Sequence, residues 1–200
     1  MICVFEGPDG SGKSTLVAEL ARQFGEERTS VWCRGPFPED GNPWTEYFHP
    51  LSGLYPSADW LVVMDRWHIG ELVYGPLLRG GSRLSAPQRD YVDTFLHHVG
   101  AIMVYLTASS EEIRRRLADR GDDLIEAEQI PAISLAYDRA FRAGQTHLTV
   151  RRHDTTGQRT EPFASSLLLA AELESGVAMS RWNHPSSDKR PFWEVHEWPS

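Results

Sequence analysis

Residues 7–15 read Gly-Pro-Asp-Gly-Ser-Gly-Lys-Ser-Thr, a spacing of glycine, lysine and hydroxyl residues that suits the binding of nucleotide phosphates. Glycines let successive backbone N–H groups turn toward phosphate oxygens, and Lys13 adds a cation for the β- and γ-phosphates. The Ser14 hydroxyl is an oxygen ligand of the kind that Mg²⁺ accepts. The loop predicts ATP and Mg²⁺ as cofactors, held by Gly7, Asp9, Gly10, Ser11, Gly12, Lys13, Ser14 and Thr15. The plain alternative is a glycine-rich turn without a ligand. The side chain of Lys13 is expected to be directed to the surface.

A second group of reactive side chains follows an apolar run at 61–64, where Asp65, Arg66 and Trp67 come in succession. A carboxylate at such a strand end can hold a magnesium-bound water or orient an attacking group, and a guanidinium can grip a phosphate with its planar fork. We predict Ser14 and Asp65 as the metal ligands and count Lys13, Asp65 and Arg66 as catalytic candidates. The alternative is a surface ion pair between Asp65 and Arg66, with Trp67 covering the core.

Arginines dominate a third segment, which begins with Ser109-Ser110-Glu111-Glu112. The serine and glutamates suit the start of a helix, because they oppose its free N–H groups and its positive end. Arg116 and Arg120 are four residues apart and share one face, so we favour them as further catalytic residues. The alternative is a solvated helix with ion pairs such as Glu112–Arg116.

The elements that must position these groups alternate between strands and helices, which is typical of an α/β fold with a doubly wound parallel sheet. Strands are predicted at 2–6, 30–34, 60–65, 101–107 and 146–151. Helices are predicted at 13–25, 68–80, 86–98, 109–120, 129–143 and 162–174. Ligands of such a sheet bind at the carboxyl ends of its strands. We expect one domain over 1–174, a mostly irregular loop over 35–59 and an extension over 175–200.

Composition restricts the classes of partner. The chain has 200 residues and a formal net charge of −8, which argues against a broad nucleic-acid-binding face without excluding a local basic groove. Cys3 and Cys33 lack metal-ligand spacing and indicate reduced thiols in the cytoplasm. We find no apolar run long enough to cross a bilayer, so no membrane partner is expected.

The segments 5–15 and 65–67 resemble the opening and the Asp-Arg-aromatic motif of the thymidylate kinase and deoxynucleoside kinase superfamily of P-loop kinases. The resemblance implies a P-loop NMP-kinase-like three-layer fold with a five-stranded parallel sheet, an arginine-bearing lid at about 114–128 and a homodimer. It also implies that Asp9 contacts the acceptor's sugar hydroxyl, Arg66 its phosphate, and Asp65 the magnesium shell or the attacking oxygen. Residues 154–156 fall where the family's adenine-contacting loop begins.

The acceptor side departs from the thymidylate kinase pattern, because residues 34–40 read Arg-Gly-Pro-Phe-Pro-Glu-Asp in place of Arg-Glu-Pro-Gly-Gly-Thr. Glu39 or Asp40 is a candidate for the base of a nucleoside kinase, and either is equally a solvated loop acid. Further candidates for the acceptor pocket are Trp44, Tyr47, Phe48, His68, Glu71, Tyr74 and Tyr137. The structural alternative is packing for residues 44, 47, 48 and 137, and a helix cap or a hydrogen-bonded structural role for His68.

The expected function is ATP- and Mg²⁺-dependent phosphoryl transfer to a deoxynucleoside monophosphate, with thymidylate as the first acceptor. The alternatives are a deoxynucleoside kinase and a kinase that acts on DNA or on a modified base in DNA. The least favoured alternative is a non-catalytic nucleotide-binding module.

Overall fold

The computed structural model describes residues 1–33, 40–42, 44–121, 128–142 and 144–183. Its centre is a five-stranded, all-parallel sheet in the order β2-β3-β1-β4-β5. The strands are β1 (Ile2–Glu6), β2 (Thr29–Cys33), β3 (Leu61–Asp65), β4 (Ala101–Thr107) and β5 (Thr149–Asp154). The α-helices are α1 (Lys13–Phe24), α2 (His68–Arg79), α3 (Ala86–His98), α4 (Ser110–Arg120), α5 (Ile130–Arg142) and α6 (Thr160–Asn183).

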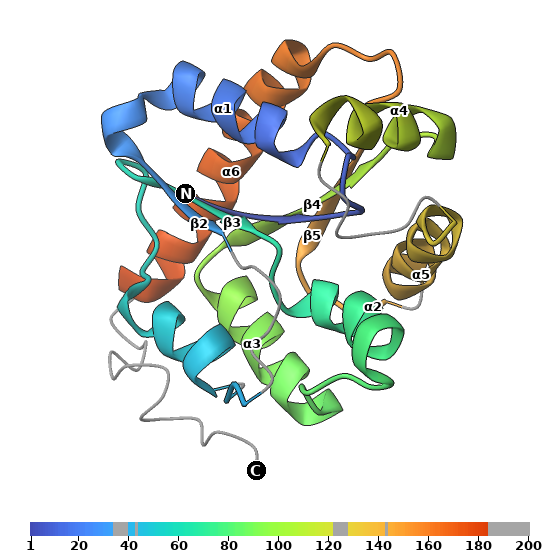
Figure 1. The fold of residues 1–200 in the computed structure, drawn as a ribbon. Coiled ribbons are helices and arrows are strands. Elements are labelled where there is room, and N and C mark those ends of the chain that lie inside the picture. Colours follow the sequence, from blue (N-terminus) through green and yellow to red (C-terminus); the bar gives the residue numbers. More distant parts are fainter. Residues whose placement is uncertain (34–39, 43, 122–127, 143, 184–200) are drawn as a thin grey trace.

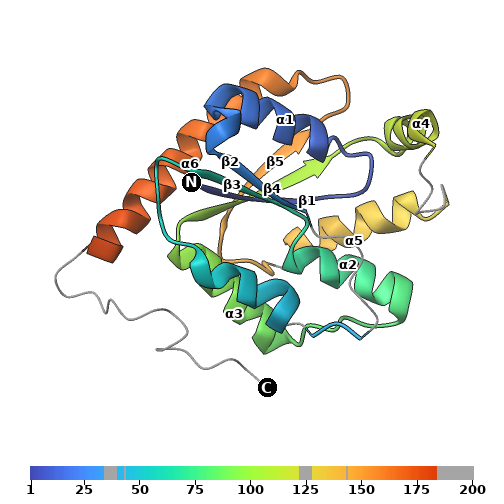
Figure 2. The same cartoon turned by 60° about the vertical axis from the view of Figure 1, so that its left-hand side comes forward.

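Helices cover both faces of the sheet, which gives the expected three layers. α1 and α6 pack on one face of the sheet, and α2, α3 and α5 lie on the other side (Figure 1). Figure 2 shows α4 beyond the carboxyl end of the sheet. Two apolar clusters correspond to the two faces, one around Phe5, Leu16 and Leu167 and the other around Met64 and Phe95. Burial of such side chains stabilises the fold by about 1.5–3 kcal/mol each.

The central strand β1 positions the phosphate-binding loop. It pairs in parallel with β3 on one side and with β4 on the other. All five of its residues are buried, as expected for a strand covered on both faces. The order of strands changes direction beside β1, so the loop after Glu6 emerges at the crevice where such sheets bind ligands.

Strand β5 begins at Thr149, not at 146 as predicted. The side chain of Asp93 on α3 accounts for the difference, because it accepts hydrogen bonds from Thr146 Oγ1, at 2.6 Å, and from the backbone N–H of His147. These residues are thereby bound to α3 and do not pair with β4. Such a contact between distant segments leaves no mark in the local pattern.

Helix α6 is longer than predicted and continues to Asn183, across the expected boundary between 174 and 175. Its second half packs against the segments that precede β3 and β4. Ser175 is 1% exposed, and its hydroxyl donates to Ser57 O at 2.9 Å. A Cβ atom on Gly100 would lie 2.7 Å from Glu174 O, so this glycine permits the close approach of the helix.

No helix among the described residues has the length and apolar character needed to cross a membrane.

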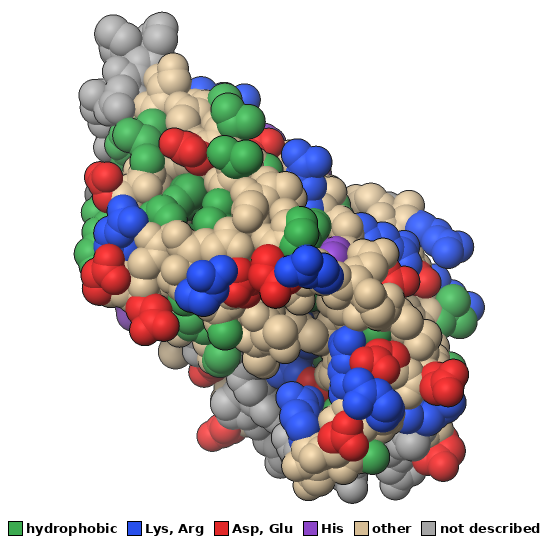
Figure 3. All heavy atoms as spheres, turned by 90° about the horizontal axis from the view of Figure 1, so that it is seen from above, with side chains coloured by type: hydrophobic (Ala, Val, Ile, Leu, Met, Phe, Trp, Pro, Cys, Tyr) green, Lys and Arg blue, Asp and Glu red, His purple; other side chains and the backbone are tan. Residues whose placement is uncertain are grey.

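Charged side chains are mixed on the face shown in Figure 3, where Lys and Arg lie among Asp and Glu. Ion pairs contribute to this mixture, for example Arg115 with Asp119 and Arg22 with Glu19. Exposed pairs of this kind contribute only about 0.2–1 kcal/mol each.

Candidate active site

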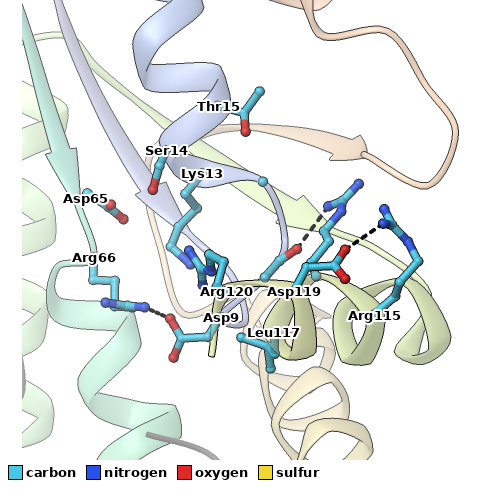
Figure 4. Close-up of a pocket in the computed structure, with 13 residues that line it drawn as sticks. Asp9, Lys13, Ser14, Thr15, Asp65, Arg66, Arg115, Leu117, Asp119 and Arg120 are labelled. Atoms are coloured by element: carbon cyan, nitrogen blue, oxygen red, sulfur yellow. Dashed lines mark hydrogen bonds and ion pairs between the residues drawn. The ribbon is translucent and has the colours of Figure 1, made fainter. Parts of the chain in front are cut away.

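A cavity of about 490 Å³ lies at the carboxyl edge of the sheet, between the phosphate-binding loop, the end of β3 and α4 (Figure 4). It brings together most of the residues that the sequence singles out. The predicted residues that line it are Asp9, Gly10, Gly12, Lys13, Ser14, Thr15, Asp65, Arg66, Arg116 and Arg120. Arg115, Leu117 and Asp119 also line it, although the sequence reasoning did not place them there.

The loop has the backbone geometry of a cradle. Gly7, Gly10 and Gly12 have φ values of 145°, 77° and 90°, a region that residues with side chains rarely adopt. A Cβ atom on Gly7 would also collide with Leu106 O. Ser11 is buried, and its hydroxyl has no hydrogen-bond partner in the described part of the chain. The loop ends at the first residue of α1, so the N-terminus of this helix faces the cavity, as an anion site requires.

Lys13 is buried, so the expectation that it points to the surface is wrong. Its side chain is only 5% exposed, and Nζ donates to Gly7 O at 2.9 Å and to Pro8 O at 2.8 Å. The lysine thus folds back over its own loop. Burial lowers the pKa of Lys13 to about 8; Asp65 and Glu6 raise it, and Arg120 lowers it further.

We expect nucleotide affinity to fall as the pH rises through about 8, the pKa of the buried Lys13 ammonium. Phosphate groups favour the charged form, so nucleotide binding above this pH must be accompanied by proton uptake. The dissociation constant of a fluorescent ATP analogue, measured between about pH 7 and about pH 9, tests this. Lys13→Met should remove most of the dependence. A wild-type affinity that stays constant over this range would contradict the assignment.

Asp65 ends β3 beside Lys13 and has the character of a metal ligand. Its Oδ1 atom is buried without a hydrogen-bond partner among the described residues, and Oδ2 has only a weak contact with Cys33 Sγ at 3.9 Å. Burial raises the pKa of Asp65, and the charge of Lys13 opposes this shift. A buried carboxylate oxygen without a partner, next to a phosphate cradle, fits the oxygen chemistry that Mg²⁺ prefers.

Arg66 has a φ of 62°, the one positive value of a non-glycine residue in the described segments. This left-handed conformation costs about 1–3 kcal/mol and occurs most often where function requires it. The guanidinium forms an ion pair with Asp9, as Figure 4 shows. Asp9 also accepts a hydrogen bond from Tyr74 Oη at 3.3 Å. The alternative pairing of Arg66 with Asp65 is therefore not observed, and Arg66 faces the loop across the cavity.

The two favoured arginines of α4 differ in their surroundings. Arg116 Nη1 donates to Gly10 O and to Thr155 Oγ1, at 2.9 and 2.8 Å, while Nε donates to Glu112 at 2.7 Å. Its guanidinium therefore joins the phosphate-binding loop to the segment after β5. Arg120 lines the cavity and acts on Lys13 through its charge.

The N-terminus of α4 has the expected cap, because Ser109 Oγ accepts from Glu112 N at 3.2 Å. The arginine-rich segment forms ion pairs of Glu112, among them the expected one with Arg116, and also lines the cavity, and the catalytic roles of Arg116 and Arg120 stay predictions. Residues 122–127 of the expected lid lie outside the described residues.

Comparison with known proteins gives relatives of similar length. No protein-family model matches the chain. The SPbeta prophage-derived protein YorR of Bacillus subtilis (strain 168) is 29% identical over 173 residues, which are 86% of this chain and 99% of YorR. A crystal structure of YorR has a TM-score of 0.72 to this chain at 26% identity, and the match covers 88% of this chain and 98% of that of YorR.

Two more distant structures are kinases. Deoxyadenosine kinase from M. mycoides has a TM-score of 0.55 at 17% identity, with 84% of this chain and 98% of the kinase covered. Polyphosphate kinase 2 from Arthrobacter aurescens TC1 has a TM-score of 0.60 at 16% identity, with 94% and 71% covered. This chain has the fold of the P-loop kinases. The α/β fold class expected from the sequence is thereby confirmed, and the expected resemblance to P-loop kinases is confirmed at the level of the fold.

Two of the acceptor-pocket candidates, His68 and Glu71, are buried and bound to other side chains of the protein. His68 is fully buried, with Nε2 at 2.9 Å from Asp93 Oδ1. Glu71 is 4% exposed and binds Arg79 with both oxygens, at 2.6 and 2.7 Å. The structural alternative for His68 is thus observed, and Glu71 is held in an ion pair with Arg79.

The aromatic candidates for the acceptor pocket differ in whether they pack in the core or contact the cavity. Phe48 is 1% exposed and packs edge-on against Tyr91 and Phe95, so it belongs to the core. Tyr47 is 6% exposed and lies edge-on to the buried Trp67. Tyr74 contacts a residue that lines the cavity, because its Oη donates to Asp9. The Trp44 side chain and Glu39 lie outside the described residues, and Asp40 is exposed.

Glu6 is a residue of the site to which the sequence reasoning assigned no role. It is fully buried, and its carboxylate accepts hydrogen bonds from the N–H groups of Trp67 and Gly70 and from Tyr137 Oη. Burial raises the pKa of Glu6, and the two backbone hydrogen bonds oppose this shift. The sequence feature that could have pointed to Glu6 is its charge, because the rest of the strand directly before the loop is apolar.

Thr155 is a second residue with more contacts than its position suggested. Its hydroxyl donates to Ser11 O at 3.0 Å and accepts from Arg116, which brings the segment after β5 against the phosphate-binding loop. Thr155, in the segment 154–156, therefore lies against the phosphate-binding loop. The contact of this segment with adenine remains a prediction.

Proposed function

We propose that this protein transfers the γ-phosphoryl group of ATP, with Mg²⁺, to a deoxynucleoside monophosphate, and that thymidylate is the first acceptor to test. The observation that carries the proposal is the meeting of two motifs in one cavity. Lys13 and Ser14 come from the phosphate-binding loop, while Asp65 and Arg66 come from the end of β3. A donor site needs Asp65 for its magnesium ion but has no need of Arg66, which would bind a second phosphate.

The donor side consists of the loop N–H groups, Lys13 and the N-terminus of α1. Their positive character matches a triphosphate, and Ser14 with Asp65 supplies oxygen ligands for Mg²⁺. When bound, the ion would neutralise charge on the phosphates and orient them. Lys13 would exchange its contacts with Gly7 O and Pro8 O for phosphate oxygens.

The acceptor side consists of Arg66 and Asp9. A guanidinium binds a phosphate through two parallel hydrogen bonds, and Arg66 is held at the cavity by its ion pair with Asp9. We assign the acceptor phosphate to Arg66 and the sugar hydroxyl to Asp9. Arg120 and Arg116 would offset the charge that develops on the transferred group, since phosphoryl transfer depends mainly on positioning and electrostatics.

The ligands of the similar proteins support a nucleotide substrate. The YorR crystal structure is a complex with phosphorylated GDP. M. mycoides deoxyadenosine kinase has been solved with dCTP, with dATP and with dCMP. Guanine nucleotides and deoxycytidine and deoxyadenosine compounds therefore belong among the donors and acceptors to be assayed.

We place the reaction in the cytoplasm, acting on a small molecule rather than on DNA. Cys3 and Cys33 are free thiols, as a reducing compartment requires. The mixed charges of Figure 3 and the net charge of −8 disfavour a nucleic-acid polymer as partner.

The proposal includes a homodimer, and light scattering of the purified protein would test it.

The decisive assay couples ADP release to a panel of deoxynucleosides, deoxynucleoside monophosphates and a short DNA oligomer. Turnover with a monophosphate alone is expected and would identify the base. Turnover with nucleosides alone would move the function to a deoxynucleoside kinase. Turnover with DNA alone would indicate a polymer kinase. ATP hydrolysis that no acceptor stimulates would refute the proposal.

Asp65→Asn is expected to raise the Mg²⁺ concentration needed for half-maximal activity and to lower kcat by about 10²–10³-fold. Asparagine keeps the shape but removes the charge of the buried oxygen that has no partner among the described residues. The measurement is kcat as a function of Mg²⁺ concentration. Asp90→Asn, at an exposed carboxylate paired with His147, is the matched control and should behave as the wild type. An unchanged Mg²⁺ dependence in Asp65→Asn would remove this residue from the metal site.

A further inference from the structure

Glu6 lies at the end of β1, where its carboxylate is completely enclosed. Oε1 accepts from Trp67 N at 2.9 Å and from Gly70 N at 3.0 Å, and Oε2 accepts from Tyr137 Oη at 3.2 Å. One side chain thus connects the strand before the phosphate-binding loop with the segment after Arg66, with α2 and with α5. A fully enclosed carboxylate is costly, and these hydrogen bonds compensate for the lost hydration.

Two consecutive residues of β1 hold the backbone on both sides of Arg66. Arg66 N donates to Phe5 O at 2.9 Å, and the next N–H, that of Trp67, donates to Glu6 Oε1. Arg66 has its φ of 62° between these two bonds. A strained conformation of this kind persists only where the surrounding structure enforces it. Glu6 is therefore part of what directs the Arg66 side chain toward Asp9.

Gly70 shows that α2 is fitted closely to this carboxylate. A Cβ atom at position 70 would lie 3.1 Å from Glu6 Oε2 and 3.5 Å from Tyr137 Oη. The first distance is shorter than an ordinary van der Waals contact, so the neighbours would have to shift. Gly70 has no positive φ, and alanine is the better helix former. The glycine is thus required for space rather than for backbone conformation.

We propose that Glu6 is a positioning residue for the acceptor, which holds Arg66 and the start of α2 in the orientation that receives the acceptor phosphate. This inference rests on the proposed function for the role of Arg66. Glu6 itself does not contact the substrate, because its oxygens are enclosed and occupied by three donors. It acts on the acceptor side through Arg66. The hydrogen bonds of Lys13 go to Gly7 O and Pro8 O, and Glu6 affects Lys13 only through its charge, which raises the pKa of the lysine.

The kinetics of Glu6→Ala and Glu6→Gln distinguish a loss of Arg66 positioning from a general loss of structure around the site. Glu6→Ala should raise the acceptor KM by at least about tenfold, since small displacements of binding groups are costly, and leave the affinity for a fluorescent ATP analogue within about twofold. Glu6→Gln retains an Oε1 acceptor for both N–H groups and should recover most of the loss. Equal weakening of donor and acceptor binding, or an unchanged acceptor KM, would overturn the inference.

Gly70→Ala tests the same contact from the other side and avoids deletion of a buried group. It should raise the acceptor KM in the wild-type background and have little further effect in Glu6→Ala, because the clash partner is then absent. Gly176→Ala is the matched control, since this glycine also lies in a helix but a Cβ atom there would meet nothing within 4 Å. Additive effects of the changes at positions 6 and 70 would count against the proposal.

Amide hydrogen exchange distinguishes a failure of this inference from a failure of the proposed function. In Glu6→Ala, the amides of Trp67 and Gly70 should exchange faster, while those of α1 remain protected. If no acceptor is turned over by the wild type, the proposed function fails, and the exchange data alone decide whether Glu6 holds the Arg66 segment. Unchanged exchange at both amides would overturn the inference, whether or not the protein is active.

Discussion

Lys13→Ala should lower kcat by at least about 10²–10³-fold, the scale found when a single charge-stabilising donor is removed from an active site. The lysine is the first residue of α1 and lines the cavity together with Asp65 and Arg66. Its loss removes the cation nearest to the loop that would receive the β- and γ-phosphates. Steady-state kinetics with ATP, Mg²⁺ and the preferred acceptor would measure the effect.

The stability of Lys13→Ala is expected to stay close to that of the wild type. The variant leaves two loop carbonyls without their ammonium donor, at a cost of about 1–3 kcal/mol for each group that stays unsatisfied. Removal of a buried cation whose pKa is lowered to about 8 offsets this cost. Thermal unfolding would check the balance. Arg22→Ala, on the exposed last turn of the same helix, is the matched control for loss of a cation. Activity retained in Lys13→Ala would refute the donor site.

Arg66→Ala should lower kcat/KM for a monophosphate acceptor by about 10²-fold or more, because a bidentate charged contact is lost at the reacting phosphate. Most of the loss should appear in the acceptor KM, with donor affinity retained. Arg66→Lys should recover only part of it, since an ammonium lacks the planar fork. Arg28→Ala, at an exposed arginine just before β2, serves as the control. Normal kinetics of Arg66→Ala with monophosphates would move the acceptor phosphate elsewhere.

The backbone at position 66 adds a second test. Because Arg66 has a φ of 62°, glycine there relieves strain that alanine retains. Arg66→Gly should therefore be about 1–2 kcal/mol more stable than Arg66→Ala while being equally impaired in catalysis. Denaturant unfolding of the two variants would compare them. Equal stability would mean that the left-handed conformation is not maintained in solution.

The order of the elements followed from local pattern alone. Apolar runs at 2–6, 61–64 and 101–107 gave strands within a residue or two of those observed, because continuous apolar runs are typical of strands covered on both faces. The predicted start of β5 and the predicted end of α6 were wrong. Asp93 accounts for the first, and the second half of α6 has contacts with distant segments, such as the bond from Ser175 to Ser57 O, that local pattern does not reveal.

The sequence by itself determined the chemistry of the site: a phosphate-binding loop, a carboxylate and an arginine at the end of a strand, and arginines on a following helix. These groups are short motifs, and parallel strands bring their carboxyl ends to one edge whatever the details of packing. The tertiary structure alone decided which polar residues face the cavity and which are enclosed behind it. Glu6 bonds to partners 61, 64 and 131 residues away, and His68 to one 25 residues away. Such contacts depend on the packing of whole helices against the sheet, which local spacing does not encode.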